Sequence, residues 1–299
     1  MPSSLIKRMA HVGLHVPDVE ASVGWATTVM GLREVDRADG VVYLTDCDCH
    51  HSLQFYESDR SALDHIAMEA HDEAALEELR RRLDEASIEI VADTPQELGI
   101  ERAIRFLGPD GHLIEVFTGM EEAGPVHTGA GVQPRKFGHP TLTCPDTGPT
   151  RRLFEEVLEF RLSDEIGDGV LAFLRCHPEH HGLGLQKGEP GLNHYAWEVE
   201  SLSELGRLGE TLARNGGRFI WGPGRHGAGE NLFTYHFDPA GCVVEYYADM
   251  YKILDERTFE PGHWSLDDHQ GQNLWGPTTP HELMVASTPL AAAPVSVEQ

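Results

Sequence analysis

Three residues near the end of the chain are of types that can act together in catalysis. His226 follows a glycine-rich turn, Tyr235 lies in the aromatic run that comes next, and Glu245 lies within the apolar segment 243–247. A buried carboxylate costs free energy unless it is paired or binds a metal. On this ground alone two interpretations of Glu245 stay open: a surface-facing side chain on a half-exposed strand, or a metal ligand.

Two histidines lie on predicted strands earlier in the same half of the chain. Side chains alternate between the two faces of a strand. Over 137–144 this alternation places His139 and Thr141 on one face, and His194 lies on the polar face of a later run. If the apolar faces pack on helices, His139, His194 and Glu245 line one cavity. Two histidines and one carboxylate form the facial triad of non-haem Fe(II) oxygenases, although any single histidine is more often a core residue.

The segment from Gly224 to Glu245 resembles the signature of the type I extradiol ring-cleavage dioxygenases, which belong to the vicinal oxygen chelate superfamily. The matching pattern is Gly-x-His, then Tyr, then Asp-Pro-x-Gly-x-x-x-Glu. One position departs, because the family usually has an apolar residue where this chain has Thr234. The resemblance covers roughly residues 5–285, and its specific motifs lie in 137–247.

The resemblance implies a role for each residue of this constellation. His139, His194 and Glu245 correspond to the ligands of the catalytic metal. The metal is expected to be Fe(II), with Mn(II) as the alternative, because both ions accept the same two nitrogens and one oxygen. His226 and Tyr235 match the family residues that hydrogen-bond the catechol oxygens.

Three further residues join the predicted site. The resemblance carries the role of a histidine beside dioxygen to His181, which comes before an apolar strand. His177 and His180 are expected in an exposed histidine-rich turn. Thr141 shares the strand face of the metal ligands, and Trp221 lies in the loop before the Gly-x-His motif. We predict that Thr141 and Trp221 both contact substrate.

The activity that the resemblance implies is extradiol cleavage of a small aromatic diol by O2, a reaction of aromatic compound degradation. The loop 219–223 is apolar and aromatic rather than basic, which favours catechols with neutral or apolar substituents. Two alternatives remain: another vicinal oxygen chelate metalloenzyme, such as a glyoxalase, and a protein of the same fold that sequesters ligands without chemistry. The resemblance also implies a homo-oligomer.

Composition narrows the classes of partner. The 299 residues carry a formal net charge of −26, which argues against binding to nucleic acid phosphates. No apolar run approaches the length of a membrane span, and the first residues lack the features of a signal peptide. Five cysteines are too few and too scattered for a disulfide framework, so we expect a cytoplasmic protein.

An internal repeat relates the two halves of the chain. The segments around His11, His65 and Glu115 match those around His139, His194 and Glu245, at offsets of 128, 129 and 130 residues. The halves are therefore nearly colinear, and duplication of one domain is the simplest cause.

Each half of the chain contains two units, and the pattern of each unit predicts one strand, then one helix, then three strands. Helices are expected over 18–30, 72–86, 150–159 and 201–216, with Ser201 and Glu204 forming a capping box. The predicted fold class is α+β, and the resemblance implies two vicinal oxygen chelate domains, each built from two βαβββ modules in an open, barrel-like sheet. The expected divisions are an N-terminal domain (1–120), a linker (121–134), a catalytic domain (135–250), a docked extension (251–285) and a disordered tail (286–299).

The N-terminal domain keeps the ligand types but is predicted to be a non-catalytic remnant. By the offset of 130, Gln96 stands at the position of His226, and Arg105 at that of Tyr235. An arginine in the cavity would repel a divalent cation and pair with Glu115 instead.

Overall fold

The computed structural model describes residues 5–125 and 129–291, and its strands form two sheets. The first sheet contains β1 (Ile6–Val16), β2 (Arg33–Ala38), β3 (Val41–Thr45), β4 (Leu53–Glu57), β5 (Ala62–Ala70), β6 (Ile90–Ala92), β7 (Ile100–Leu107) and β8 (Leu113–Met120). The second contains β9 (Lys136–Cys144), β10 (Arg161–Ile166), β11 (Leu171–Arg175), β12 (Leu183–Lys187), β13 (Gly191–Glu198), β14 (Trp221–Arg225), β15 (Leu232–Phe237), β16 (Val243–Ala248), β17 (Gly262–Trp264) and β18 (Thr288–Pro289).

Strand order shows the fourfold repeat that the sequence predicted. The first sheet runs β2-β3-β4-β1-β5-β8-β7-β6, so two four-stranded modules meet where β1 and β5 pair antiparallel. The second sheet repeats this order around the antiparallel pair β9 and β13, with β17 added at one edge. In each module the first strand pairs parallel to the last, as β13 does with β16. The predicted α+β fold class with two βαβββ modules per sheet is confirmed.

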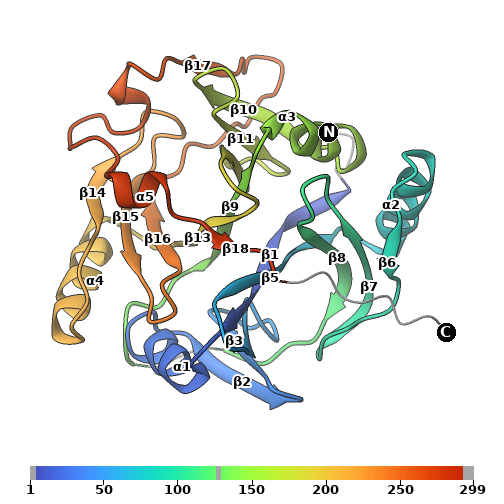
Figure 1. Cartoon of the computed structure of the whole chain (residues 1–299), viewed down its shortest axis with the longest axis horizontal. Helices are drawn as coiled ribbons and strands as arrows, with labels where there is room; N and C mark the ends of the chain where they lie inside the picture. Colours follow the sequence, from blue (N-terminus) through green and yellow to red (C-terminus); the bar gives the residue numbers. More distant parts are fainter. Residues whose placement is uncertain (1–4, 126–128, 292–299) are drawn as a thin grey trace.

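One helix covers each module on the outside of the molecule (Figure 1). The module helices are α1 (Val19–Thr28), α2 (Glu73–Glu85), α3 (Thr147–Arg152), which continues into the π-helical turn η1 (Leu153–Val157), and α4 (Leu202–Arg214); η2 (His269–Gly271) and α5 (His281–Met284) follow in the C-terminal extension. The apolar face of α4 shows why a helix forms and where it packs, because Leu205, Leu208 and Leu212 recur at helical spacing and are buried. None of the described helices has the length and apolarity needed to span a membrane.

The ends of two helices differ from the predictions. The helix expected over 150–159 begins earlier, because Asp146 caps it by accepting a hydrogen bond from the Gly148 N–H. The expected capping box does not form: among the described residues the Ser201 hydroxyl caps no backbone N–H, and Glu204 accepts from the N–H of Glu200. The chain enters α4 with Ser201 extended, and this brings the preceding N–H toward the Glu204 carboxylate.

Part of the segment predicted to be a disordered tail is ordered. Thr288–Pro289 forms β18 and pairs with the start of β13, and the Ala291 N–H donates to the Leu63 carbonyl of the first sheet. Unpaired polar groups in the two sheets thereby gain backbone partners. Residues 286–291 therefore join the two sheets, and the rest of that predicted tail, 292–299, lies outside the described residues.

The helix caps give a test of how local signals support this fold. The Asp18 carboxylate accepts the Ala21 N–H at 2.9 Å, whereas Ser201 holds the same position without a side-chain bond. We expect Asp18→Ala to lower the free energy of unfolding by about 0.5–2 kcal/mol, because a helix N-terminal N–H loses its partner. Ser201→Ala is the matched control and should cost less than about 0.5 kcal/mol. Urea titration measures both, and equal losses would contradict the structure.

Candidate active site

Three neighbouring strands of the second sheet bring the predicted metal ligands together. His139 on β9 and Glu245 on β16 both lie opposite Ala196 of β13, and His194 lies two residues before Ala196 on the same face. The Nε2 atoms of His139 and His194 lie 3.0 and 3.2 Å from the same Glu245 oxygen, Oε2. One ligand atom from each of the three residues lies within 4.8 Å of the others. The small side chain of Ala196 leaves the space between them open.

The charge state of this cluster suits a cation. Burial acts to raise the pKa of Glu245, but the interactions of this carboxylate with His139 and His194 outweigh burial and hold the pKa well below its ordinary value. Burial lowers the pKa of His194, so this imidazole is neutral. A buried, ionised carboxylate and imidazole nitrogens facing one point are the donor set that a divalent metal requires. The three residues therefore fit the metal that the resemblance implies.

Two asparagines that the sequence analysis did not assign hold these ligands in place. The Asn193 carbonyl oxygen accepts the His194 Nδ1–H at 2.7 Å, which places the ring lone pair on Nε2, 3.1 Å from the Thr141 hydroxyl. The Asn193 amide donates in turn to the carbonyls of Leu283 and Ala286 in the C-terminal extension. Asn231 donates to Glu245 Oε1 at 3.3 Å. A signal for Asn193 existed, because the repeat places Asp64 before His65 in the same way.

His226 and Tyr235 form a pair beside the triad. Tyr235 lies between Trp221 and Glu245 in the strand register, so its side chain shares their face. Its hydroxyl lies 3.1 Å from His226 Nε2, and His226 Nδ1–H donates to the Gln272 carbonyl. Burial lowers the pKa of His226 to about 4 and raises that of Tyr235 well above its ordinary value. Both groups are therefore neutral, with Tyr235 able to donate and His226 Nε2 able to accept a proton.

His181 lies against the triad, as its predicted place near the metal requires. Its ring centroid lies 4.4 Å from that of His139 and 4.8 Å from that of Phe173. The prediction of an exposed His180 is wrong: this side chain is buried and meets His181, with 3.0 Å between their Nδ1 atoms. Asp164 lies 3.5 Å from His180 Nε2. The Asp164 carboxylate gives the buried His180 ring a charged neighbour. The residues around His180 in the sequence do not indicate this contact.

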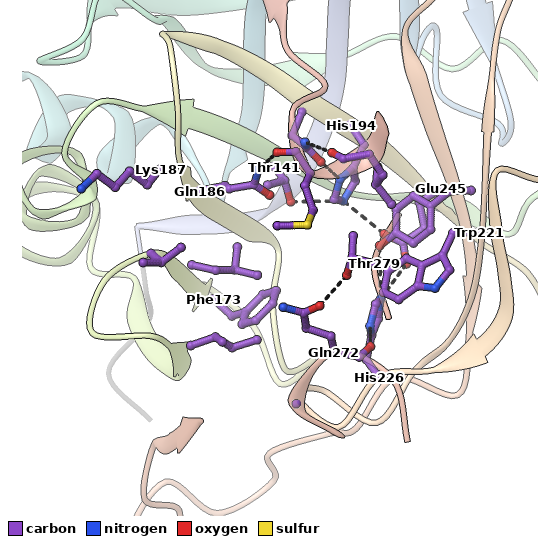
Figure 2. Close-up of a pocket in the computed structure, with 18 of the residues that line it drawn as sticks. Thr141, Phe173, Gln186, Lys187, His194, Trp221, His226, Glu245, Gln272 and Thr279 are labelled. Carbon is purple, nitrogen blue, oxygen red and sulfur yellow. Dashed lines mark hydrogen bonds and ion pairs between the residues drawn. The ribbon is translucent and has the colours of Figure 1, made fainter. Parts of the chain in front are cut away.

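A cavity of about 200 Å³ joins these residues. Figure 2 shows Thr141, His194, Glu245 and His226 on one side and Phe173 across from them. Trp221 also lines the cavity, and its indole N–H donates to the Pro277 carbonyl. The opposite wall is apolar and comes from two strands, the turn between them and the C-terminal extension: Ile166, Val170, Leu171, Phe173, Leu266 and Met284. The structure thus brings all eight predicted site residues to one cavity, with a polar end and an apolar end.

Comparison with known proteins defines the class to which this fold and site belong. The sequence matches the Glyoxalase/Bleomycin resistance protein/Dioxygenase superfamily over residues 8–116 and 136–246. The chain belongs to this superfamily. Within it, the fold and the curated relatives identify the chain as a type I extradiol dioxygenase, a ring-cleaving enzyme that uses a non-haem divalent metal.

The relatives match over nearly their whole length. Metapyrocatechase 2 of Cupriavidus necator is 29% identical, covering 96% of this chain and 94% of that protein. The manganese-dependent 2,3-dihydroxybiphenyl 1,2-dioxygenase of Geobacillus genomosp. 3 is 26% identical, covering 90% and 93%. The solved structure of the 2,3-dioxygenase LapB from Pseudomonas sp. KL28 has a TM-score of 0.83 at 26% identity, covering 89% and 99%. The Mn(II)-bound glyoxalase from Novosphingobium aromaticivorans has a TM-score of 0.85 at 28% identity, covering 96% of each chain.

The Asn193 contact generates a prediction about metal affinity. Asn193→Ala removes the acceptor that holds the His194 ring and its tautomer, so we expect metal affinity to fall by about 10–100-fold. Asn215→Ala, at the exposed end of α4, is the control and should bind metal as the unchanged protein does. Competition with a chromophoric chelator measures both affinities. An unchanged affinity in Asn193→Ala would remove this residue from the support of the metal ligands.

Proposed function

We propose that this protein cleaves the ring of a catechol with an apolar substituent, at a metal held by His139, His194 and Glu245. The observation that carries the proposal is the cavity itself. Its polar end combines the triad with His226 and Tyr235, and its other wall is apolar. A metal bound there supplies positive charge and a template for the catechol oxygens and dioxygen.

Fe(II) is the proposed metal, with Mn(II) as the alternative. Two imidazole nitrogens and one carboxylate oxygen accept either ion. A manganese-dependent relative and an Mn(II)-bound structural neighbour support Mn(II) as the alternative. The N-terminal domain is proposed to be non-catalytic. A cytoplasmic homo-oligomer is also part of the proposal; all five cysteines lie in the described chain as free thiols, in keeping with a reducing compartment.

His226 and Tyr235 have complementary roles in this proposal. Tyr235 donates a hydrogen bond to one catechol oxygen, and neutral His226 accepts the proton of a catechol hydroxyl at Nε2. The Gln272 carbonyl holds the opposite ring nitrogen, so the accepting atom faces the cavity. Tyr235 is buried and the His226 side chain is 16% exposed, so little water reaches the pair to compete for these bonds.

The wall opposite the triad determines the preferred substrate. Among the lining residues that the structure describes, Lys187 carries the one formal positive charge, and its side chain extends away from the labelled polar end (Figure 2). Gln186 and Gln272 also line the cavity but carry no charge, so a carboxylate on the ring would lose hydration without gaining a cationic partner. An alkyl or aryl group would gain free energy from burial in the same place.

The activity test compares substrates under air after loading with Fe(II). We expect a yellow ring-cleavage product from 3-methylcatechol and 3-phenylcatechol, with kcat/KM roughly tenfold or more above that of a carboxylate-bearing catechol. Glu245→Ala should lose both metal and activity. A preference for the carboxylate-bearing substrate that disappears in Lys187→Ala would contradict the assignment of the apolar wall.

The glyoxalase alternative is tested in the same preparation. A structural neighbour carries that name, and isomerisation of a glutathione hemithioacetal would not need the Tyr235 and His226 pair. Ring cleavage without hemithioacetal turnover supports the dioxygenase, and the reverse result supports the alternative.

His181 provides a separate test of proton handling. Burial holds its pKa well below the ordinary value, so it enters the reaction neutral, beside His139 but outside the ligand set. We expect His181→Phe to keep its metal and a near-normal KM while kcat falls by about 10²–10⁴-fold, the usual contribution of a positioned acid or base. Metal analysis and steady-state rates measure this. Loss of metal in His181→Phe would instead make His181 a ligand or a support of one.

A further inference from the structure

The N-terminal domain contains a second buried cluster of metal-ligating side chains. His11 lies on β1, His65 on β5 and Glu115 on β8, the strands that correspond to those of the catalytic triad. Glu97, in the loop between β6 and β7, joins them: its carboxylate lies 3.1 Å from His11 Nε2 and 2.9 Å from His65 Nε2. One ligand atom from each of the four residues lies within 4.8 Å of the others.

The positions of the imidazole rings match those of the catalytic domain. The centroids of His11 and His51 are 4.5 Å apart at 61°, against 4.4 Å and 64° for the corresponding pair of His139 and His181. His11 and His65 are 5.2 Å apart at 84°, against 5.5 Å and 80° for the metal ligands of the catalytic site. Duplication has therefore preserved the ligand geometry as well as the residue types.

The structure changes the part assigned to Arg105. The expected pairing is present, because Arg105 Nε donates to Glu115 Oε2 at 2.6 Å, but Arg105 Nη2 also donates to Glu97 Oε1. The offset of 130 had placed Gln96 in this cavity, and that assignment is wrong by one position: Gln96 is exposed and Glu97 points inward. The guanidinium thus meets two carboxylates, and one negative charge remains uncompensated.

The oxygens that Arg105 does not hold face the histidines without hydrogen bonds. Glu97 Oε2 and Glu115 Oε1 accept no aligned hydrogen bond among the described residues, although Glu97 Oε2 also lies 3.4 Å from His51 Nε2. They lie 3.1 and 3.8 Å from His11 Nε2, so acceptor atoms and an imidazole nitrogen face the same point. Buried polar atoms in folded proteins are nearly always satisfied. Here a cation at the centre of the four residues would satisfy both carboxylates.

The formal charges around this point support a divalent ion. Asp64 accepts the His65 Nδ1–H at 2.7 Å, as Asn193 does for His194 in the catalytic domain. The buried carboxylates of Glu97 and Glu115 face one guanidinium, so one net negative charge remains among them when the imidazoles are neutral; Asp64 is 20% exposed and also pairs with His15. Burying an uncompensated charge is costly, and a divalent cation balances this charge together with that of Asp64.

We propose that His11, His65, Glu97 and Glu115 bind a second, structural divalent transition-metal ion of the zinc type. Arg105 orients the two carboxylates through their outer oxygens and leaves the inner oxygens to the ion. The site is closed: the side chains of both histidines and of Glu115 are 0% exposed, whereas His194 and His226 in the catalytic domain are 10% and 16% exposed. Four protein ligands without an open position are typical of structural rather than catalytic sites.

Metal content in a background without the catalytic site tests this proposal. The full-length His139→Ala variant is loaded anaerobically with Zn²⁺, Fe²⁺ or Mn²⁺, dialysed and analysed by mass spectrometry. We expect one retained ion per chain in His139→Ala, and its removal by a chelator should lower Tm by several degrees, since metal affinity contributes to folding. This test is independent of ring cleavage, so failure of the proposed reaction would not affect it.

Variants of the second cluster distinguish binding from folding. In the His139→Ala background, Glu97→Gln keeps side-chain volume and should lose the ion, whereas the exposed His71→Ala is the matched control and should keep it. His11→Ala should lose the ion as well. The proposal is overturned if His139→Ala retains no ion after loading with any of the three metals and if the chelator leaves its Tm unchanged. The cluster is then neutralised by protons, with His65, whose pKa Glu97 raises against burial to about 9, as the protonated group.

Discussion

The catalytic domain is built around an ionised carboxylate that is almost completely removed from water. Glu245 is 1% exposed, and it stays charged because two imidazoles and one amide point at it. Without such partners a carboxylate on this strand would be protonated or would destabilise the sheet. The strand register around Ala196 provides the partners, since it places His139 and Glu245 on both sides of one small residue. The same arrangement that stabilises the carboxylate therefore forms the metal site.

The C-terminal extension is part of the site rather than an appendage. Its carbonyls accept hydrogen bonds from Asn193 and His226, and its side chains form one wall of the cavity. Asn193 in turn fixes the His194 ring. Ligand orientation, substrate orientation and cavity shape thus depend on one segment that returns to the sheet after the last module.

The two domains show what one scaffold does with the same ligand types. In the C-terminal domain, Tyr235 and His226 border an accessible cavity beside the proposed metal ligands, which leaves room for a substrate. In the N-terminal domain, Arg105 and Glu97 occupy the corresponding space and close it. An open site permits binding of a diol and dioxygen, whereas a closed one can contribute only stability. Divergence after duplication therefore acted on the residues around the triad and left the triad itself in place.

Much of this protein is determined by its sequence alone. Strand alternation and the internal repeat indicated the fourfold βαβββ organisation, and the family resemblance carried by the histidine, tyrosine and glutamate motif indicated the residues that line the cavity. These signals depend on neighbouring residues or on a regular spacing, so they can be recognised in the sequence before the fold is known. The Asp18 and Asp72 caps belong to the same class, because each bonds an N–H three residues away.

Other features were decided only by the tertiary structure, because they depend on contacts between separate segments of the chain. The inward turn of Glu97 toward His11, the burial of His180 against Asp164 and the support of His194 by the extension all involve partners from separate elements of the chain. A shift of one position in a loop exchanges an exposed side chain for a buried one, and no periodic pattern records that choice. The free energy of burying charge beside a distant partner selects the position, and this partner exists only once the chain has folded.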